Sequence, residues 1–281
     1  GSHTNLVQLL HGTTRIIDRP CSETVSERRT DRSVLTVERI VEFADSLCPE
    51  DVQELFERQI SYNMAIAEAG LSGAYGANVG RTLREAYGEA VQNRARYMAA
   101  AASDARMSGC ELPVVINSGS GNQGITATVP ILSAAKSLGI DEERTFRAVT
   151  LSNLMAIHIH ADFGPLSGLC GATIAAAAAA CGLVYLQGGT LEQIGFAVNN
   201  MFGNVSGMLC DGAKADCALK ISTCVFAAFQ CAAMALRSES VKATDGIVET
   251  DPEETIRNFV RLGNEGSSKC DDLILEMLLQ K

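Results

Sequence analysis

One glycine-rich stretch combines residue types that bind anions. Residues 117–124 read Asn-Ser-Gly-Ser-Gly-Asn-Gln-Gly, follow the β-like run 114–116 and precede a helical pattern. Glycines let the backbone turn tightly and expose its N–H groups, and the start of the following helix adds positive potential, so this loop suits a carboxylate or a phosphate. It is neither a Walker loop nor a dinucleotide fingerprint, and a plain connector is an equally good interpretation of the residues alone. The candidate ligand-binding residues are Ser118, Gly119, Ser120, Gly121, Asn122 and Gln123.

Three of the ten cysteines are candidate metal ligands: Cys170, Cys210 and Cys217. Two of them lie beside glycine and turn residues, where the backbone can approach a bulky cofactor, and thiolates at helix starts gain from the helix dipole. Cysteines recur every seven residues from Cys210 to Cys231. Seven residues of straight helix span about 10.5 Å, which is too far for neighbouring ligands of one compact cluster. Cys224 and Cys231 are therefore predicted to be packing residues, whereas Cys210 can join Cys217 if residues 211–215 turn back. From the spacing alone, buried structural cysteines are the commoner state.

His158 and His160 form a third candidate, in the run Ile-His-Ile-His. Alternate spacing suits a strand, but the surrounding pattern is helical, and on a helix the two side chains point about 200° apart. The pattern therefore favours packed, hydrogen-bonded histidines over a joint ligand pair.

Composition excludes several classes of protein. The 281 residues are 47% hydrophobic and 20% charged, which is typical of a globular chain and not of a disordered one. A net charge of −10 argues against a broad nucleic-acid-binding surface. No signal-like segment precedes the body, and most cysteines lie in apolar, alanine-rich sequence, so we expect reduced thiols in a cytoplasmic protein.

The elements that position these residues are predicted to be mainly helical. Apolar residues recur at helical spacing from about residue 35. Thr82 with Glu85 and Thr190 with Gln193 match the capping-box pattern, and Asp251 followed by proline is typical of a helix start. The predicted helices include 52–69, 82–103, 125–138, one opened by 141, one opened by 190, and 251–262.

Residues 163–191 contain no charged side chain, and residues 221–236 form a second uncharged run. The first run holds a proline, six glycines and many alanines, which contribute little lipid affinity. Helices buried at the centre of a large helical domain are therefore favoured over membrane spans. Such long apolar helices are also compatible with a homodimer.

The N-terminal part differs from this helical body. Residues 1–3 (Gly-Ser-His) resemble the scar of a cleaved affinity tag, and residues 5–17 predict a β-hairpin around a His-Gly-Thr-Thr turn. A hairpin alone is barely stable, so we interpret residues 4–33 as the hairpin and linker of a truncated N-terminal α/β region. Residues 34–281 are predicted to form the large helical domain, with buried alanine-rich central helices.

Several segments taken together resemble the L-cysteine desulfidase family, whose members are related to the iron–sulfur L-serine dehydratase alpha chain. The resemblance covers roughly residues 36–281 and is carried by five motifs: Leu-Pro-Val-Val-Ile-Asn-Ser-Gly-Ser-Gly-Asn-Gln-Gly (112–124), Leu-Cys-Gly-Ala (169–172), Gly-Met-Leu-Cys-Asp-Gly-Ala-Lys (207–214), Cys-Ala-Leu-Lys (217–220) and Asp-Pro-Glu-Glu-Thr-Ile-Arg-Asn (251–258).

The resemblance implies a [4Fe–4S] cluster held by three cysteines, which match Cys170, Cys210 and Cys217, with the fourth iron open to substrate. It implies β-elimination, in which L-cysteine and water give pyruvate, ammonia and hydrogen sulfide. The 118–124 loop is then expected to hold the substrate carboxylate. Lys214 is a further candidate substrate-binding residue, and Lys214 or Lys220 is expected to balance charge.

One motif of that family is missing. Its members are similar in having an earlier Gly-Cys-Thr-Glu-Pro segment whose cysteine is thought to act as the catalytic base, and this sequence has no such segment. We therefore expect a chain that binds the cluster weakly and does not turn over cysteine.

Three alternatives stay open at this point. The first is the same chemistry with L-serine as the substrate. The second is a non-catalytic helical binding module that keeps the fold and binds no cluster. The third is a thiol redox sensor, although the absence of any Cys-x-x-Cys pair argues against it.

Overall fold

The computed structural model describes residues 6–20, 30–163 and 168–280 of the 281-residue chain. The described part contains one two-stranded sheet and eleven α-helices, so the mainly helical fold class predicted from the sequence is confirmed. The predicted tag scar at residues 1–3 and most of the predicted linker (21–29) lie outside the described residues. By its internal contacts the chain divides into residues 1–34 and 35–281.

The first unit contains the predicted hairpin. Strand β1 (Gln8–His11) pairs antiparallel with β2 (Thr14–Asp18), with Leu9 opposite Ile17 and His11 opposite Thr14. Gly12 supplies the positive φ of 59° that the tight turn between the strands needs.

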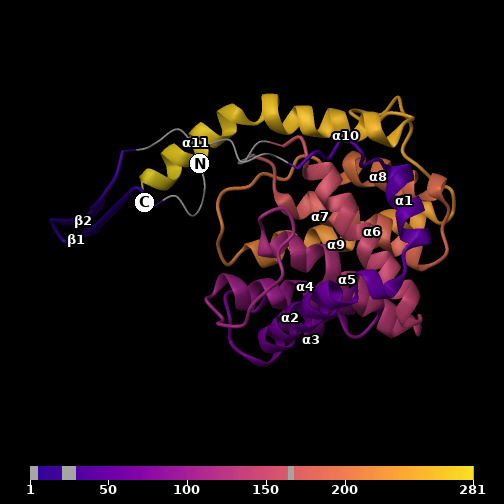
Figure 1. The fold of residues 1–281 in the computed structure, drawn as a ribbon, viewed down its shortest axis with the longest axis horizontal. Coiled ribbons are helices and arrows are strands. Elements are labelled where there is room, and N and C mark those ends of the chain that lie inside the picture. The colour runs from indigo at the N-terminus through magenta and orange to yellow at the C-terminus, as the bar shows by residue number, and fades with distance from the viewer. Residues whose placement is uncertain (1–5, 21–29, 164–167, 281) are drawn as a thin grey trace. The chain divides into compact units, whose positions relative to one another are not determined.

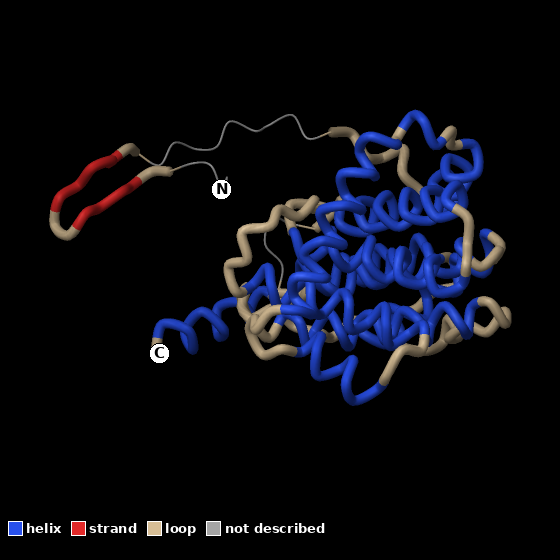
Figure 2. The backbone as a smooth tube through the Cα atoms, turned by 90° about the horizontal axis from the view of Figure 1, so that it is seen from below, coloured by secondary structure: helices blue, strands red, loops and turns tan. Residues whose placement is uncertain are grey.

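The second unit is an all-helical body (Figures 1 and 2). Its helices are α1 (Val37–Ser46), α2 (Gln53–Ser72), α3 (Val79–Tyr87), α4 (Val91–Met107), α5 (Gly121–Leu138), α6 (Glu142–His160), α7 (Gly171–Leu186), α8 (Leu191–Val205), α9 (Cys217–Ala235), α10 (Pro252–Arg261) and α11 (Ser268–Leu279). A short 3₁₀ turn (Pro49–Asp51) precedes α2, and a π turn (Leu262–Gly266) joins α10 to α11.

Helix α7 is the centre of this body (Figure 1). Fifteen of its sixteen residues are buried, and it packs against α5, α6, α8 and α9. Small side chains permit this crowding: a Cβ on Gly182 would lie 2.4 Å from the Ile131 side chain of α5. Within the uncharged run, residues 171–186 therefore form a core helix, as the sequence predicts.

Helix α9 is long and apolar enough to cross a membrane by length and composition, and half of its most apolar window is buried in the protein. It packs against α4, α7 and α8. A core helix passes the same test of length and composition, and these contacts account for its apolar character.

Several predicted helix starts are confirmed, and two are wrong: α5 begins at Gly121 and not at 125, and α3 begins at Val79 and not at 82. Asp141 and Asp251 cap α6 and α10, and Thr190 forms a complete capping box with Gln193 at α8. The predicted helix 82–103 is two helices, because α3 begins at Val79 and the chain breaks at Gly88 before α4. Gly88 has φ of 70°, a left-handed conformation that ends α3.

Candidate functional site

The glycine-rich stretch forms a tight reverse turn followed directly by α5. The N–H of Asn117 donates to the carbonyl oxygen of Ser120 (3.1 Å), and the N–H of Ser120 donates back to Asn117 (3.0 Å). Ser118 and Gly119 adopt positive φ angles of 48° and 81°, as the two central residues of a type I′ turn must. The β-like run before it is not a strand, since the backbone of Val115 instead pairs with a side-chain amide.

Buried amides hold this turn in place. Asn117 Nδ2 donates to both the carbonyl oxygen (3.1 Å) and the side-chain oxygen (3.0 Å) of Asn153 on α6. Asn153 exchanges two further hydrogen bonds with Gln59 on α2. Asn63, one turn later on α2, binds the N–H (2.9 Å) and carbonyl (3.3 Å) of Val115. The turn is therefore fixed by side chains from two helices rather than by a sheet.

Helix α5 begins immediately after the turn. Ser120 is the N-cap, and its hydroxyl accepts the N–H of Gln123 (3.3 Å). The first N–H groups of an α-helix have no partner within the helix and carry its positive end, so an anion is favoured there. The predicted loop residues thus lie where an anion-binding group would have to lie, although the helix starts at Gly121 and not at 125.

Backbone pairing brings two of the three candidate cysteines together. Leu169 and Leu209 form an isolated antiparallel bridge. The N–H of Cys170 donates to Met208 (2.8 Å), and the N–H of Cys210 donates to Gly168 (2.9 Å). Cys170 is then the N-cap residue of α7, and it is buried.

Cys217 is the first residue of α9, seven residues after Cys210. The N–H of Cys217 donates to Lys214 (3.0 Å), and Lys220 Nζ donates to the carbonyl of Leu209 (3.0 Å). These bonds hold the α9 start beside the Cys210 segment.

The surroundings of Cys170 shift its pKa in opposite directions. Burial raises the pKa of Cys170, and the charges of Cys210 and Cys217 raise it further, while Lys220 opposes them. Cys210, Cys217 and Lys220 therefore all act on the Cys170 thiol. Among the described residues, however, no three His, Cys, Asp or Glu side chains converge closely enough to hold a single metal ion.

The two lysines near the cysteines are paired with Asp211. Lys214 lies 2.6 Å from Asp211 and 3.4 Å from Asp216, and Lys220 also pairs with Asp211. Hydrogen bonds from Lys214 and Lys220 hold the pKa of Asp211 well below its usual range. Burial lowers the pKa of Lys220, but its pairing with Asp211 outweighs this and raises it.

Cys224 and Cys231 pack in the core, as predicted from their spacing. Burial raises the pKa of Cys231 to about 11 and raises that of Cys224 further, so both are neutral thiols. Cys224 Sγ lies 3.6 Å from Met208 Sδ, and Met208 is the residue whose carbonyl oxygen accepts the N–H of Cys170.

Two glycines at helix starts are contacted by side chains of neighbouring helices. A Cβ on Gly171, the first residue of α7, would lie 2.8 Å from Gln123 Nε2. A Cβ on Gly121, the first residue of α5, would collide with the guanidinium of Arg106 on α4, whose Cζ lies 2.8 Å away. Helices α5 and α7 therefore start side by side, next to Cys170.

The sequence gives no sign of Arg106 at this site. Its position beside the start of α5 follows only from its long-range contact with Gly121.

The histidines do not form a joint site. They lie in the last turn of α6, where His158 Nε2 is 2.8 Å from Glu253 and the ring of His160 packs beside Phe163. This confirms the prediction of packed, hydrogen-bonded histidines.

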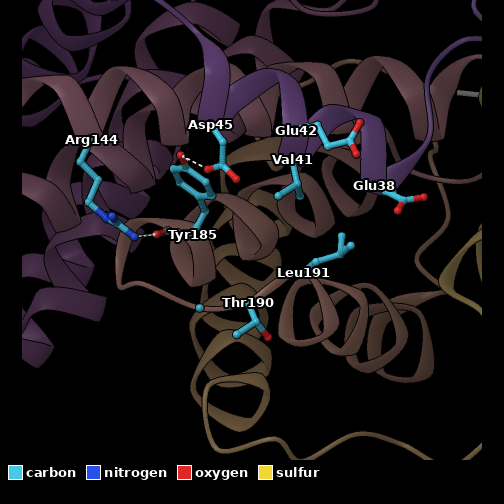
Figure 3. Close-up of a pocket in the computed structure, with 9 residues that line it drawn as sticks. Glu38, Val41, Glu42, Asp45, Arg144, Tyr185, Thr190 and Leu191 are labelled. Atoms are coloured by element: carbon cyan, nitrogen blue, oxygen red, sulfur yellow. Dashed lines mark hydrogen bonds between the residues drawn. The ribbon is translucent and has the colours of Figure 1, made fainter.

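Two cavities lie elsewhere in the body. One, of about 400 Å³, borders the His158–Glu253 pair, and another, of about 310 Å³, lies at the C-terminal end of α7 (Figure 3). In Figure 3 the Tyr185 hydroxyl donates to Asp45 (2.8 Å), and Arg144 reaches the carbonyl oxygen of Tyr185 (2.7 Å). Neither cavity is lined by the loop or cysteine residues predicted from the sequence.

Comparison of this sequence with known proteins identifies the family to which the chain belongs. The family model described as serine dehydratase alpha chain matches residues 21–276. A UPF0597 protein of Lachnoclostridium phytofermentans is 46% identical over 257 residues, covering 92% of this chain and 62% of that protein. UPF0597 proteins of Desulfitobacterium hafniense (47% over 252 residues, 90% of this chain and 59% of that protein) and Fusobacterium nucleatum (41% over 283 residues, 99% and 66%) are similar too.

The chain thus spans about 60% to two thirds of the length of these curated relatives. No solved structure matches it. Because the family model covers most of the chain and the relatives are more than 40% identical, the chain belongs to the serine dehydratase alpha chain family.

Proposed function

We propose that this chain is the cluster-binding part of an iron–sulfur-dependent lyase that performs β-elimination on L-cysteine, giving pyruvate, ammonia and hydrogen sulfide. One observation carries the proposal. The Leu169–Leu209 bridge places Cys170 and Cys210 on paired backbone segments, beside the start of α9 at Cys217.

The donor set suits a cluster better than a single ion. Each cysteine of an iron–sulfur cube binds a different iron, so the thiols must surround a group instead of converging on one point. The proposal assigns the three thiols to three different irons, and it is supported by the pairing of the Cys170 and Cys210 segments beside the start of α9. The starts of α7 and α9 add positive potential that favours thiolates and a negatively charged cluster.

Cys170, Cys210 and Cys217 would hold the cluster, and the α5 loop would bind the substrate beside it. When bound, a cluster with one open iron supplies a Lewis acid for the departing thiol. The Gln123–Gly171 contact keeps the α5 start against Cys170. Elimination removes the Cα proton and the β-thiol, and hydrolysis of the resulting enamine yields pyruvate and ammonia. The base that takes the Cα proton is not assigned to any of these residues.

L-Serine is the second candidate substrate, because the matching family is described as the serine dehydratase alpha chain. The two reactions differ only in the leaving group, which is water for serine and hydrogen sulfide for cysteine. All nine cysteines that the structure describes are free thiols. A cluster enzyme with free thiols suits a reducing compartment, so we propose the cytoplasm.

Anaerobic reconstitution with iron and sulfide tests the proposal. The parent chain is compared with Cys210→Ala and with Cys48→Ala, an exposed free cysteine that serves as the matched control. We expect visible cluster absorption and about four iron and four labile sulfide per chain for the parent and for C48A, and loss of both for C210A. Equal iron content in C210A and the parent would contradict the cysteine assignment and favour a non-catalytic helical module.

The loaded parent chain is then given L-cysteine or L-serine in separate assays. Sulfide release from cysteine that exceeds pyruvate formation from serine supports the desulfidase, and the reverse supports the dehydratase. Because the relatives are longer than this chain, a loaded chain that releases no product places the base outside these 281 residues. Rapid turnover places the base within them.

A further inference from the structure

Helix α9 is covered on one side only. Its contacts with α4, α7 and α8 bury half of its most apolar window, and the other half is exposed. No charged residue lies between Lys220 and Arg237, so the exposed side is as uncharged as the buried one. Six exposed residues make up this side, which we call the α9 seam: Leu219, Thr223, Phe226, Gln230, Ala233 and Met234. A helix that is apolar on all sides is normally covered on all sides, so the seam is expected to have a partner.

The spacing of the α9 seam is that of two helices packed along each other. From Leu219 to Ala233 its members lie four, three, four and three residues apart, and Met234 adjoins the last of them. This alternation is the heptad spacing, which keeps side chains on one stripe of a helix. Leu219 and Phe226 are 53% and 48% exposed, so the largest apolar side chains of the stripe are left uncovered in the described structure. The occupant that fits such a stripe is another helix.

The α9 seam is self-complementary. Phe226 is the middle residue of α9. Thr223 and Gln230 lie three and four residues on either side of it, and Leu219 and Ala233 lie seven residues on either side. When an identical helix packs antiparallel about a twofold axis, each residue meets the one at the same distance on the other side of the axis. The Phe226 rings of the two copies then meet, Thr223 meets Gln230, and Leu219 meets Ala233.

The charges at the two ends of α9 match the same arrangement. Asp216 directly precedes the helix with 41% of its side chain exposed, and Arg237 is exposed just beyond the other end. No ion pair of the described residues includes Arg237. Antiparallel pairing brings the start of one α9 to the end of the other, so each Asp216 faces an Arg237 and the pair occurs twice. Because the chain has a net charge of −10, two copies approach most easily along an uncharged stripe with complementary ends.

Neighbouring helices widen this surface at its centre. The Arg96 guanidinium on α4 lies 5.4 Å from the centroid of the Phe226 ring and 5.1 Å from that of Tyr87 on α3. Its Nε donates to the hydroxyl of Ser222 (3.2 Å), and Tyr87 is 58% exposed. Aromatic residues and arginine are enriched among the residues that dominate the binding energy at the centre of interfaces. The two rings and the guanidinium thus form an anchor at the middle of the seam.

We propose that the α9 seam binds a second copy of this chain in a twofold-symmetric dimer, with the two α9 helices antiparallel and Phe226 at the axis. The dimer is independent of the cluster and of the substrate, because no residue of the seam is a proposed ligand or substrate-binding residue.

Sedimentation velocity of the intact chain over a wide range of concentrations tests the proposal. We expect the parent to reach twice the 29.7 kDa of one chain and to dissociate on dilution. Phe226→Glu should raise the dissociation constant of the dimer at least about tenfold, because two carboxylates would be buried against each other at the axis. Leu55→Glu places the same charge at a leucine of α2 that is 57% exposed, and this matched control should leave the dissociation constant unchanged.

A charge reversal tests the antiparallel orientation. Asp216→Arg and Arg237→Asp should each weaken the dimer about threefold or more, because each breaks an ion pair that occurs twice. The combined variant D216R/R237D restores both pairs and should dimerise as the parent does. Along one α9 the two positions are about 30 Å apart, so this rescue arises only between copies. Circular dichroism of each variant establishes that it is folded.

Three outcomes would overturn the proposal. F226E could dimerise as tightly as L55E, which would place the interface elsewhere on the chain. D216R/R237D could dimerise no better than the two single variants, which would exclude the antiparallel arrangement. A parent chain that is monomeric at every concentration would also contradict the dimer, and it would favour the part of the longer relatives that this chain does not span as the occupant of the seam.

Discussion

Gln123 on α5 lies against Gly171 on α7, with Nε2 2.8 Å from the point where a Cβ would be. Because Gly171 follows Cys170 directly, this contact fixes the distance between the candidate substrate loop and a candidate cluster ligand. Gln123 is buried, so its side chain has little room to move aside. A methyl group at position 171 must therefore displace the amide.

Gly171→Ala is expected to lower iron incorporation and L-serine binding with little change in the free energy of unfolding. Alanine is a better helix former than glycine by about 1 kcal/mol, which offsets part of the steric cost. Iron content after reconstitution and chemical denaturation provide the two measurements. Gly207→Ala is the control, since a Cβ there meets open space. Iron loading of G171A equal to that of G207A would show that the contact does not shape the site.

The buried amides around Asn153 predict a large stability effect. Asn153→Ala removes both side-chain partners of Gln59, which is 3% exposed, and leaves Asn117, which is 5% exposed, only its bond to the backbone carbonyl of residue 153. We expect the free energy of unfolding to fall by about 2–4 kcal/mol, measured by urea denaturation. Asn93→Ala, which removes a surface hydrogen bond to Tyr87, should cost less than about 1 kcal/mol. Equal losses for the two variants would contradict a network that acts as a unit.

Local signals in the sequence predict helix starts only where no distant residue competes. Thr190 and Gln193 form their capping box as predicted, because both partners belong to the same short segment. Thr82 and Glu85 have the same pattern, yet Thr82 lies inside α3. The buried carboxylate of Asp104, on α4, accepts the N–H of Gly80 (2.9 Å) and so stabilises an earlier start.

The candidate site likewise combines residues that local motifs identify with residues that only long-range contacts place there. Motifs identify the loop and the three cysteines, but spacing alone left the cluster open, since the Leu169–Leu209 pairing joins segments 40 residues apart. Arg106 carries no motif of its own, and its place beside the start of α5 depends on the packing of α4 against Gly121. Residues that act through long-range contacts leave no periodic pattern in a sequence.

Arg144 binds the C-terminal end of the central helix α7. Arg144 donates to the carbonyl oxygens of Leu186 (2.9 Å) and Tyr185 (2.7 Å) at the C-terminus of α7, and its guanidinium lies 5.3 Å from the Tyr185 ring (Figure 3). Arg144→Met should lower the free energy of unfolding by about 1–3 kcal/mol, because the last carbonyls lose charge-assisted partners. Arg58→Met breaks only an exposed pair with Glu54 and should cost under about 1 kcal/mol. Thermal denaturation of both variants checks the difference, and equal midpoints would rule out a capping role for Arg144.

Acid should weaken the contact between α1, α6 and α10 through Glu253. Burial tends to raise the pKa of Glu253, but hydrogen bonds from His158 (2.8 Å) and from the N–H of Val37 (2.7 Å) outweigh it and lower the pKa below its usual 4.5. A depressed acid pKa means that the unfolded chain binds the proton more readily. The stabilisation is therefore complete above pH 4.5 and is lost as the pH falls through the lower, folded-state value.

Glu253→Gln is expected to reduce the free energy of unfolding by about 1–3 kcal/mol at pH 7, and this difference from the parent should shrink in acid, where the parent loses the same interaction. Urea denaturation at pH 7 and at about pH 3.5 measures both differences. Glu254→Gln, the next residue of α10, removes a fully exposed carboxylate whose pair with Arg257 is screened by solvent, and it should change stability much less at either pH. If E253Q lost no more stability than E254Q at pH 7, or if its loss did not depend on pH, the buried pair would not be the link that holds these three helices together.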